Sequence, residues 1–368
     1  MAPPIIKAKS RAPAGRVIRP SSRAPAARRP AAPPAPATPV PAPVPAPEVR
    51  FLVVDEGSDG QRLDNFLLRE LKGVPKTHVY RIIRSGEVRV NKGRASADTR
   101  LATGDQVRVP PVRVAAAAPG AEAAPPREFP LLYEDEHLLV IDKPAGVAVH
   151  GGSGVSFGVI EQLRRARPEA KFLELVHRLD KETSGLLLLA KKRSALTKLQ
   201  DQFRQRETGK TYAALVSGAW PANKKVVDVA LLKTLDSAGE RRVKAVAAGH
   251  EQAQRSISLV RVADSFAAPA PGFSLLDVTI KTGRTHQIRV HLAHEGHPIV
   301  GDEKYGQFAL NKALASGRLV EGCRFDRMFL HARRLAFDHP ASGERLELEA
   351  PLPPECATLL ASLATCRT

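Results

Sequence analysis

Proline is so unevenly distributed along this chain that it limits where the chain can fold. Residues 1–49 contain 14 of the 31 prolines, together with eight Lys or Arg residues and a single acid, Glu48. Such a segment cannot bury enough apolar surface to offset the entropy lost on ordering, so we expect a disordered basic arm. A transit peptide is the competing interpretation because the arm is Arg-rich, but its prolines would break the amphipathic helix that such a peptide needs.

A second Pro/Ala-rich stretch, at residues 114–128, predicts a linker between two patterned regions. The expected parts are therefore the arm, a small module at 50–113, the linker, a main domain at 129–352 and a C-terminal tail at 353–368. No apolar run approaches the ~18 residues of a membrane span. Three scattered cysteines suit neither a disulfide framework nor a CxxC zinc site. We expect a reduced, cytoplasmic protein without membrane contact.

The net charge of +18, from 56 basic and 38 acidic residues, predicts an anionic partner, with nucleic acid as the first candidate. In the small module, apolar residues at helical spacing from Leu63 to Leu71 and from Val79 to Ile83 predict two helices. Alternation at 88–90 and 107–109 predicts short strands. Basic residues occupy the positions outside this core, where we expect them to meet successive phosphates: Lys76, Arg81, Arg84, Arg89, Lys92 and Arg94.

The segments RLDNFLLREL and VPKTHVYRIIRSGEVRVNKGR of this module resemble an S4 RNA-binding domain. The resemblance implies a platform that binds the RNA backbone and recognises RNA shape, with an affinity that falls steeply with salt. The alternative for such a charge pattern is an ordinary solvated basic face.

In the main domain, buried strands predicted at 173–176 and 186–190 enclose a polar loop at 177–185 that contains Asp180. An acid between two strands is held rigidly, as a catalytic group must be, although loops also use Asp simply to form turns. Tyr212 falls on a further predicted strand, where a tyrosine is more often part of the core than catalytic.

Farther along, a strand that ends at Ile280 leads through a turn at Gly283 into a predicted helix capped by Thr285. Arg284 and Arg289 lie five residues apart across this turn. The segment HLAHEGH then places His291, His294 and His297 at intervals of three, but its spacing is not that of HExxH and no thiolate is near, so we predict no metal site.

The motifs HRLDKETSG, DKPAG, KTY and GRTHQIRVHL together resemble the RluA-type family of pseudouridine synthases. The resemblance implies an α+β fold, in which an S4-type domain precedes a catalytic domain with a mixed, mostly antiparallel sheet flanked by helices. It also implies that the chain isomerises uridine in RNA to pseudouridine, with 23S rRNA or a large-subunit precursor particle as the expected partner. The family pattern is interrupted at Arg255, at Ile257 and by the insertion SFAAPAPG, which affects RNA-facing details rather than the chemistry.

The same resemblance implies roles for individual residues. Asp180 would act as nucleophile or base, Arg289 would stabilise its ionised form, and Tyr212 would stack on uracil and assist proton removal from C5. Arg178 would fill the space that the target base leaves, and Ile288 would form the apolar floor of the pocket. The remaining expected substrate contacts are Arg284, His177, Thr183 and Gly185.

Several alternatives are open at this point. A synthase of the same family could act on another rRNA site or on tRNA, and a non-catalytic ribosome-assembly factor could use the same basic surfaces. Asp180 and Glu182 could form a glycosidase pair, but two positions in one loop poorly set the ~5–9 Å that such carboxylates need. The isomerisation has no redox step, so we expect neither cofactor nor metal, and we expect a monomer.

Overall fold

The computed structural model describes residues 48–71, 73–112, 124–151, 155–235, 241–247 and 249–366. The predicted arm at 1–49 lies outside these residues except for its last two, and most of the predicted linker lies outside them as well. In the part of the chain that is described, no helix has both the length and the apolar character needed to cross a membrane.

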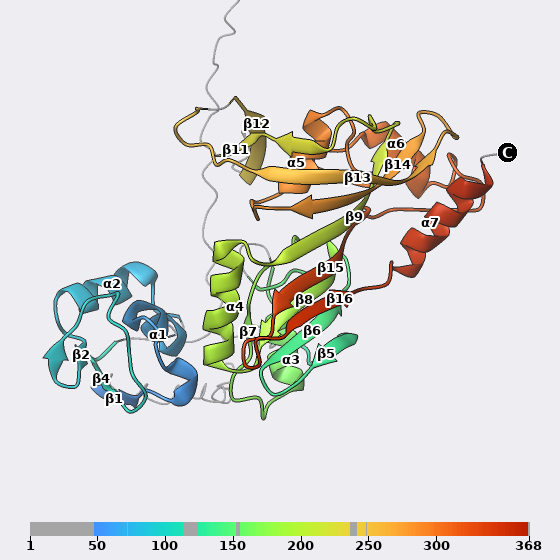
Figure 1. The fold of residues 1–368 in the computed structure, drawn as a ribbon. Coiled ribbons are helices and arrows are strands. Elements are labelled where there is room, and N and C mark those ends of the chain that lie inside the picture. Colours follow the sequence, from blue (N-terminus) through green and yellow to red (C-terminus); the bar gives the residue numbers. More distant parts are fainter. Residues whose placement is uncertain are drawn as a thin grey trace, which may run out of the picture. The chain divides into compact units, whose positions relative to one another are not determined.

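The small module combines short helices with a four-stranded sheet (Figure 1). Its apolar helix faces bury Leu63, Phe66 and Leu67 against Val79 and Ile82, as the helical spacing predicts. The strands pair in the order β1-β4-β2-β3. The elements are β1 (Arg50–Val53), the 3₁₀ helix η1 (Glu56–Ser58), α1 (Leu63–Glu70), α2 (Lys76–Arg84), β2 (Arg89–Val90), β3 (Gly93–Arg94) and β4 (Gln106–Val109).

The main domain is built on a ten-stranded sheet, whose strands change direction progressively from β13 to β5, the twist expected of an open sheet (Figure 1). Its order is β10-β13-β14-β9-β15-β8-β6-β5, with β16 beside β15 and β7 beside β8. The strands are β5 (Leu131–Glu134), β6 (Leu138–Lys143), β7 (Glu174–Leu175), β8 (Ser184–Ala190), β9 (Gly209–Ser217), β10 (Val226–Asp228), β13 (Ile257–Phe266), β14 (Phe273–Ile280), β15 (Leu330–Asp338) and β16 (Arg345–Glu349).

Helices and one hairpin complete the main domain, and the α+β architecture expected from the sequence is confirmed. The helices are α3 (Val159–Ala166), α4 (Arg193–Gln205), α5 (Gln287–His294), α6 (Phe308–Ala315) and α7 (Pro354–Thr365), and β11 (Ala230–Leu235) pairs with β12 (Arg241–Val246). The prediction of a C-terminal tail at 353–368 is corrected, because most of this segment forms α7. Cys356, Leu359 and Leu363 of this helix are buried in a cluster with Phe325.

One junction in the sheet positions the loop that carries Asp180. Strand β8 follows this loop and pairs antiparallel with β6 on one side, but parallel with β15 on the other. At the parallel junction Gly185 lies opposite Ala332, and a Cβ built on Gly185 would stand 2.3 Å from the Ala332 carbonyl oxygen. Gly185 also has φ +108°, so this close approach requires glycine.

Two details of the predicted local structure are wrong. Strand β8 begins at Ser184, so the polar loop ends two residues earlier than the pattern of apolar residues indicates. Helix α5 begins at Gln287, and its N-cap is His286 in the left-handed region (φ 52°) rather than Thr285. The side chain of Gln287 instead stabilises this turn, because its Oε1 accepts hydrogen bonds from Thr282 Oγ1 (2.8 Å) and the Arg284 N–H (3.1 Å).

Candidate active site

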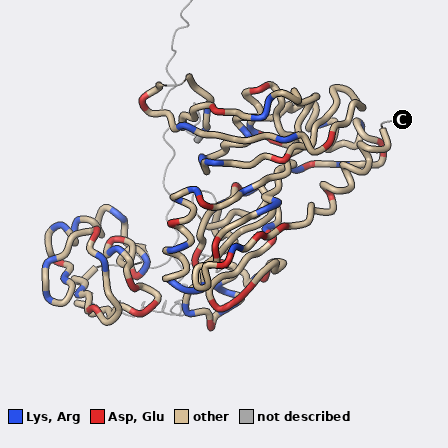
Figure 2. Tube along the Cα trace, in the orientation of Figure 1, with Lys and Arg blue, Asp and Glu red and all other residues tan. Residues whose placement is uncertain are grey.

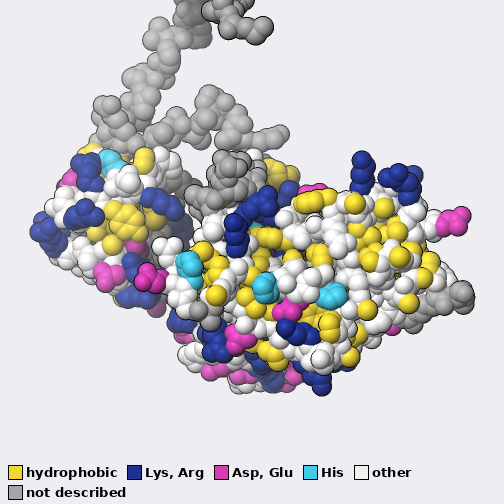
Figure 3. Space-filling model, turned by 90° about the horizontal axis from the view of Figure 1, so that it is seen from above, with side chains coloured by type: hydrophobic (Ala, Val, Ile, Leu, Met, Phe, Trp, Pro, Cys, Tyr) yellow, Lys and Arg dark blue, Asp and Glu magenta, His cyan; other side chains and the backbone are white. Residues whose placement is uncertain are grey.

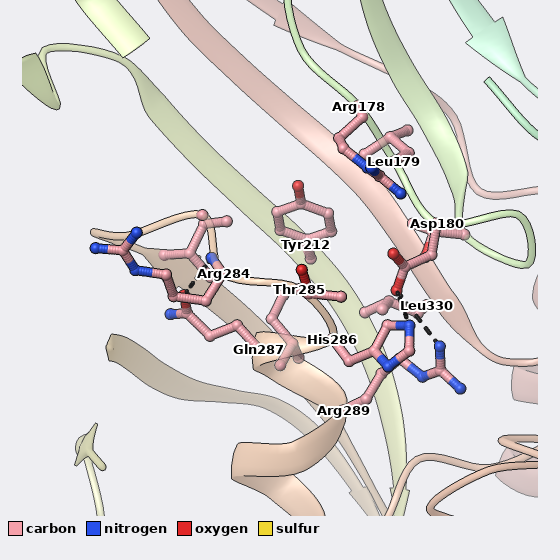
Figure 4. Close-up of a pocket in the computed structure, with 14 residues that line it drawn as sticks. Arg178, Leu179, Asp180, Tyr212, Arg284, Thr285, His286, Gln287, Arg289 and Leu330 are labelled. Carbon is pink, nitrogen blue, oxygen red and sulfur yellow. Dashed lines mark hydrogen bonds and ion pairs between the residues drawn. The ribbon is translucent and has the colours of Figure 1, made fainter. Parts of the chain in front are cut away.

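A small pocket opens where the loop before β8, strand β9 and the N-terminus of α5 meet (Figure 4). The loop supplies Asp180, β9 supplies Tyr212, and α5 supplies Arg289, so residues 109 positions apart in sequence come together. The lining residues are Arg178, Leu179, Asp180, Thr183, Tyr212, Ile280, Gly283, Arg284, Thr285, His286, Gln287, Ile288, Arg289 and Leu330.

The carboxylate of Asp180 faces two nitrogen-bearing groups across the pocket (Figure 4). Arg289 Nη1 lies 3.4 Å from Asp180 Oδ2, and His286 Nε2 lies 3.9 Å from the same oxygen. The Asp180 side chain keeps 22% of its surface exposed, so it is accessible to a ligand while its charge is balanced from behind. This is the ion pair expected from the sequence.

Arg289 binds a second carboxylate more closely than it binds Asp180. Its Nε and Nη2 donate to the two oxygens of Asp302 at 2.7 and 2.8 Å, and both side chains are buried. Burial opposes ionisation of Asp302, but the Arg289 hydrogen bonds, its charge and the N–H groups of Lys304 and Tyr305 outweigh it and lower the pKa of Asp302. Asp302 therefore fixes the direction in which the guanidinium faces the pocket.

His286 is held in the pocket by a neighbour that sequence reasoning did not identify. Its Nδ1 shares a hydrogen bond of 2.9 Å with the hydroxyl of Tyr305, whose ring also lies 5.1 Å from the Arg289 guanidinium carbon. Burial lowers the pKa of His286 and so favours the neutral ring. The negative charge of Asp180 acts in the opposite direction but does not outweigh burial. The only sequence signal for this group is the segment GDEKYG, which places an acid and a tyrosine shortly after the helix.

Tyr212 presents its ring to the pocket between Asp180 and Arg284 (Figure 4). Its side chain is half-buried, and burial together with the nearby Asp180 charge raises its pKa well above the usual value. The phenol is therefore protonated at neutral pH. Ile288, which is buried, contributes apolar surface to the same pocket.

Two residues predicted to contact substrate do not line this pocket. His177 turns away and stacks on Phe203 with a centroid distance of 4.9 Å, and its Nε2 accepts a hydrogen bond from the Leu188 N–H. Gly185 is a buried residue of β8 that packs closely against β15. The prediction that it contacts substrate is therefore wrong, and its role is in strand packing. The other predicted contacts, Arg178, Thr183 and Arg284, do line the pocket.

The three histidines of HLAHEGH have different surroundings. The ring of His291 is fully buried and shares hydrogen bonds with the hydroxyls of Ser256 (2.8 Å) and Ser258 (3.0 Å). His294 is exposed, and His297 Nδ1 lies 3.0 Å from the Ser217 carbonyl oxygen. Within the described residues, no group of three or more His, Cys, Asp or Glu is arranged to hold a metal ion.

The basic residues predicted to bind RNA in the small module lie on its surface. Arg89 is half-exposed, and the remaining five are exposed: Lys76, Arg81, Arg84, Lys92 and Arg94. Lys92 stands at a two-residue turn between β2 and β3, where it and Asn91 both have positive φ, as a type I′ hairpin turn requires. Figure 2 shows basic residues at many points along this module, with acidic residues among them.

Comparisons with known proteins agree over both parts of the chain. Residues 137–294 match the family model for RNA pseudouridylate synthase, and residues 61–107 match that of the S4 domain. Ribosomal large subunit pseudouridine synthase C of Yersinia pestis is 48% identical over 311 residues, which cover 83% of this chain and 93% of that protein. The protein of the same name from Escherichia coli (strain K12) is 47% identical, with 83% and 94% covered.

A solved structure also resembles the fold. Human RNA Pseudouridylate Synthase Domain Containing 4 aligns with a TM-score of 0.52 and 28% identity, over 64% of this chain and 93% of that one.

Proposed function

Because the chain belongs to the RNA pseudouridylate synthase family, we propose that it isomerises specific uridines of large-subunit (23S) ribosomal RNA to pseudouridine. Pseudouridine synthases are isomerases, and the family assignment rests on near-complete coverage of relatives that are almost half identical. The choice of RNA rests on the names of those relatives. We infer that an enzyme with this substrate acts in the cytoplasm.

The observation that carries the chemistry is the accessible Asp180 carboxylate, 3.4 Å from the buried guanidinium of Arg289. The reaction breaks the N1–C1′ bond of uridine, turns the uracil and forms a C5–C1′ bond, while the C5 proton is lost and N1 gains one. The numbers of atoms and electrons are unchanged, so the chemistry calls for no electron acceptor. What it needs is one ionised oxygen near C1′.

We assign that oxygen to Asp180. It serves either by attacking C1′, with the bonding electrons leaving on uracil, or by removing the C2′ proton as the uracil departs. Both routes require the ionised carboxylate, and the guanidinium of Arg289 places a positive charge 3.4 Å from it. Because Asp302 fixes Arg289, the positive charge of the guanidinium stays in place while the freed uracil rotates.

Neighbouring side chains would hold the uracil. In this proposal Tyr212 stacks on the base and Ile288 lies beneath it, while the Tyr212 hydroxyl, which is protonated at neutral pH, hydrogen-bonds the uracil and relays the C5 proton. The target must leave its stack, at a cost of a few kcal/mol. Arg178, exposed at the pocket's edge, is placed to fill the vacated position.

The remaining candidates predict different products. Action on another rRNA site or on tRNA would keep the same pocket but change the RNA that is modified. A non-catalytic assembly factor would bind rRNA without forming pseudouridine, and it would have no need for a carboxylate paired with a buried arginine.

The experiment is carbodiimide mapping of pseudouridine in 23S rRNA from a deletion strain complemented with wild type or Asp180→Asn. We expect pseudouridines to disappear on deletion, to return with wild type, and to stay absent with Asp180→Asn, which should still bind rRNA. The matched control is Glu182→Gln, since Glu182 is two positions away in the same loop but does not line the pocket.

Each part of the proposal can be refuted by a separate result. Unchanged 23S modification in the deletion strain would refute the choice of RNA. Restored modification by Asp180→Asn would refute the catalytic assignment. Loss of activity in Glu182→Gln as well would favour the two-carboxylate interpretation.

A further inference from the structure

A basic groove adjoins the pocket on the side of α4. It is formed by the C-terminal half of α4, the start of β9 and the segment after β14. Arg178, Tyr212 and Arg284 line both the groove and the pocket, so the two are continuous. A polymer with one unit in the pocket would therefore have neighbouring units at the groove.

The groove is lined with positive charge and with no acid. Its cationic lining residues are Arg178, Arg204, Arg206, Lys210, Lys281 and Arg284, and the described lining contains neither Asp nor Glu. Of these six, Arg204 is the only one with a salt bridge in the described part of the chain, to Asp201 at 2.5 Å. On the face drawn in Figure 3, Lys and Arg side chains of the main domain form separate groups with apolar surface between them, so the surface is not uniformly basic.

Lys210 is the least expected member of this group, because its side chain is buried. Only 9% of the residue is exposed, and its Nζ donates to Thr208 Oγ1 at 3.0 Å and lies 5.0 Å from the Phe203 ring centroid. Burial, then repulsion from Arg206 and Lys281, lowers its pKa. A buried lysine normally pairs with a carboxylate, and this one has no such partner among the described residues.

Arg284 has an unsatisfied donor at the junction of pocket and groove. Its Nε is buried and has no hydrogen-bond partner in the described structure. Buried polar atoms are nearly always hydrogen-bonded, so this unpaired donor indicates a missing acceptor. An anion would supply that acceptor, and it would also supply the counter-charge that Lys210 lacks among the described residues.

The helix dipole explains only part of this charge. Cations commonly stabilise the C-terminus of a helix, and Arg204 and Arg206 stand at the end of α4. Lys210 lies on β9 and Lys281 follows β14, so neither complements that dipole. His177 also lines the groove, and burial followed by the charge of Lys210 lowers its pKa to about 4, so its ring is neutral.

We propose that this groove holds the phosphate backbone of the RNA strand next to the flipped uridine, with Arg206, Lys210 and Lys281 surrounding one phosphate. This inference rests on the proposed function, since it concerns the RNA whose base enters the pocket. The phosphate supplies the counter-charge that the protein lacks, and Arg284 lies at the entrance to the groove, between this phosphate and the pocket.

The test measures binding of an unmodified 23S rRNA transcript as a function of KCl concentration. The informative variant is Arg206→Gly, because Arg206 has φ 66° at the end of α4, where glycine is favoured. It removes a charge while relieving backbone strain, so weaker binding is not a folding effect. Lys281→Ala and Lys210→Met complete the set, and Lys312→Ala, an exposed lysine of α6 outside the groove, is the control.

We expect each groove variant to weaken binding several-fold and to lower the log–log salt slope by about 0.7, the value for one contact to single-stranded nucleic acid. Lys312→Ala should change neither. If Lys210→Met fails to fold, the two surface variants decide. An unchanged slope in these variants overturns the inference, as does an equal change in Lys312→Ala. The proposed function is tested separately by pseudouridine formation in wild type, which does not depend on these slopes.

Discussion

At the scale of single residues, the central feature is an arginine shared by two carboxylates. Arg289 is bound by Asp302 through two short hydrogen bonds and approaches Asp180 with its remaining nitrogen. One carboxylate is buried and the other is accessible. The buried one therefore positions the arginine, and the accessible one is available to react.

This arrangement predicts the effect of Asp302→Asn. Breaking a buried ion pair by changing one partner costs about 3–5 kcal/mol, so we expect a loss of stability near the lower figure, because Asn keeps some hydrogen bonds. Since the folded state lowers the pKa of Asp302, its contribution is present above the unfolded pKa and disappears as the pH falls through the folded one. Urea unfolding from pH 7 to pH 3 should show the deficit shrinking with acid.

The control for this change is Glu303→Gln, at the exposed neighbouring position, which should unfold like wild type. The single tryptophan, Trp220, is buried and gives a fluorescence signal for all three proteins. Equal stability of Asp302→Asn and wild type at pH 7 would contradict the positioning role.

At the scale of elements, a lysine joins strand β6 to the loop that carries Asp180. The side chain of Lys143 is fully buried, and its Nζ donates to the carbonyls of Pro144 (2.9 Å), Val147 (2.8 Å) and Lys181 (3.0 Å). Three acceptors match the three donors of the ammonium, the form that the folded chain holds below about pH 7. The contact to Lys181 holds the loop one residue beyond Asp180.

We predict that Lys143→Met, which keeps the length of the side chain, destabilises the protein and displaces this loop. Unsatisfied buried carbonyls cost about 1–3 kcal/mol each, so the free energy of unfolding at pH 7 should fall by at least about 3 kcal/mol. Pseudouridine formation should fall further than the folded fraction does. Activity equal to wild type in the folded protein would show that the loop needs no such anchor.

A pH series separates this contact from general packing. Burial lowers the pKa of Lys143 from 10.5 to about 7. Between pH 7 and pH 10.5, Lys143 therefore holds a proton in the unfolded chain that it lacks in the folded chain. The contribution of Lys143 to the free energy of unfolding therefore rises with pH in this range. Lys143→Met should remove that rise; an identical slope in both proteins would show that Lys143 is charged in the folded state over this range.

Prediction from the sequence succeeded where local periodicity sets the structure. The apolar spacing of α1 and α2 and the apolar runs of β8 and β14 are properties of neighbouring residues, so they can be found without tertiary information. The cap of α5 was wrongly predicted, because Gln287 rather than Thr285 satisfies that turn. Asp302 was missed because its pairing with Arg289 is a tertiary contact that no periodicity encodes.

At the scale of the whole molecule, most of the net charge lies outside the main domain. Residues 1–49 contribute +7 and residues 50–113 contribute +5, which leaves only +6 for the remaining 255 residues. In the proposed mechanism the chemistry centres on one carboxylate, and a strongly positive domain is not needed for it. The N-terminal part of the chain would supply the general attraction to RNA, while the groove beside the pocket supplies local contacts.

Deleting residues 1–49 should therefore weaken rRNA binding and reduce its salt slope, with little change in the rate of the chemical step at saturating RNA. Each phosphate contact that is lost lowers the slope by about 0.7–0.9. Binding titrations at several KCl concentrations and single-turnover rates would measure the two effects. A deletion variant with the wild-type slope would show that this basic segment makes no RNA contact.

The parallel pairing of β8 with β15 also has a consequence for synthesis of the chain. Ser184 and Gly185 meet His331 and Ala332, almost 150 residues later in the sequence. During synthesis, the loop that carries Asp180 is made well before β15 (Leu330–Asp338). Until β15 has also been translated, the strand that completes the support of this loop is missing. Because non-local contacts form late, this loop gains its full support only after the chain through β15 has been made.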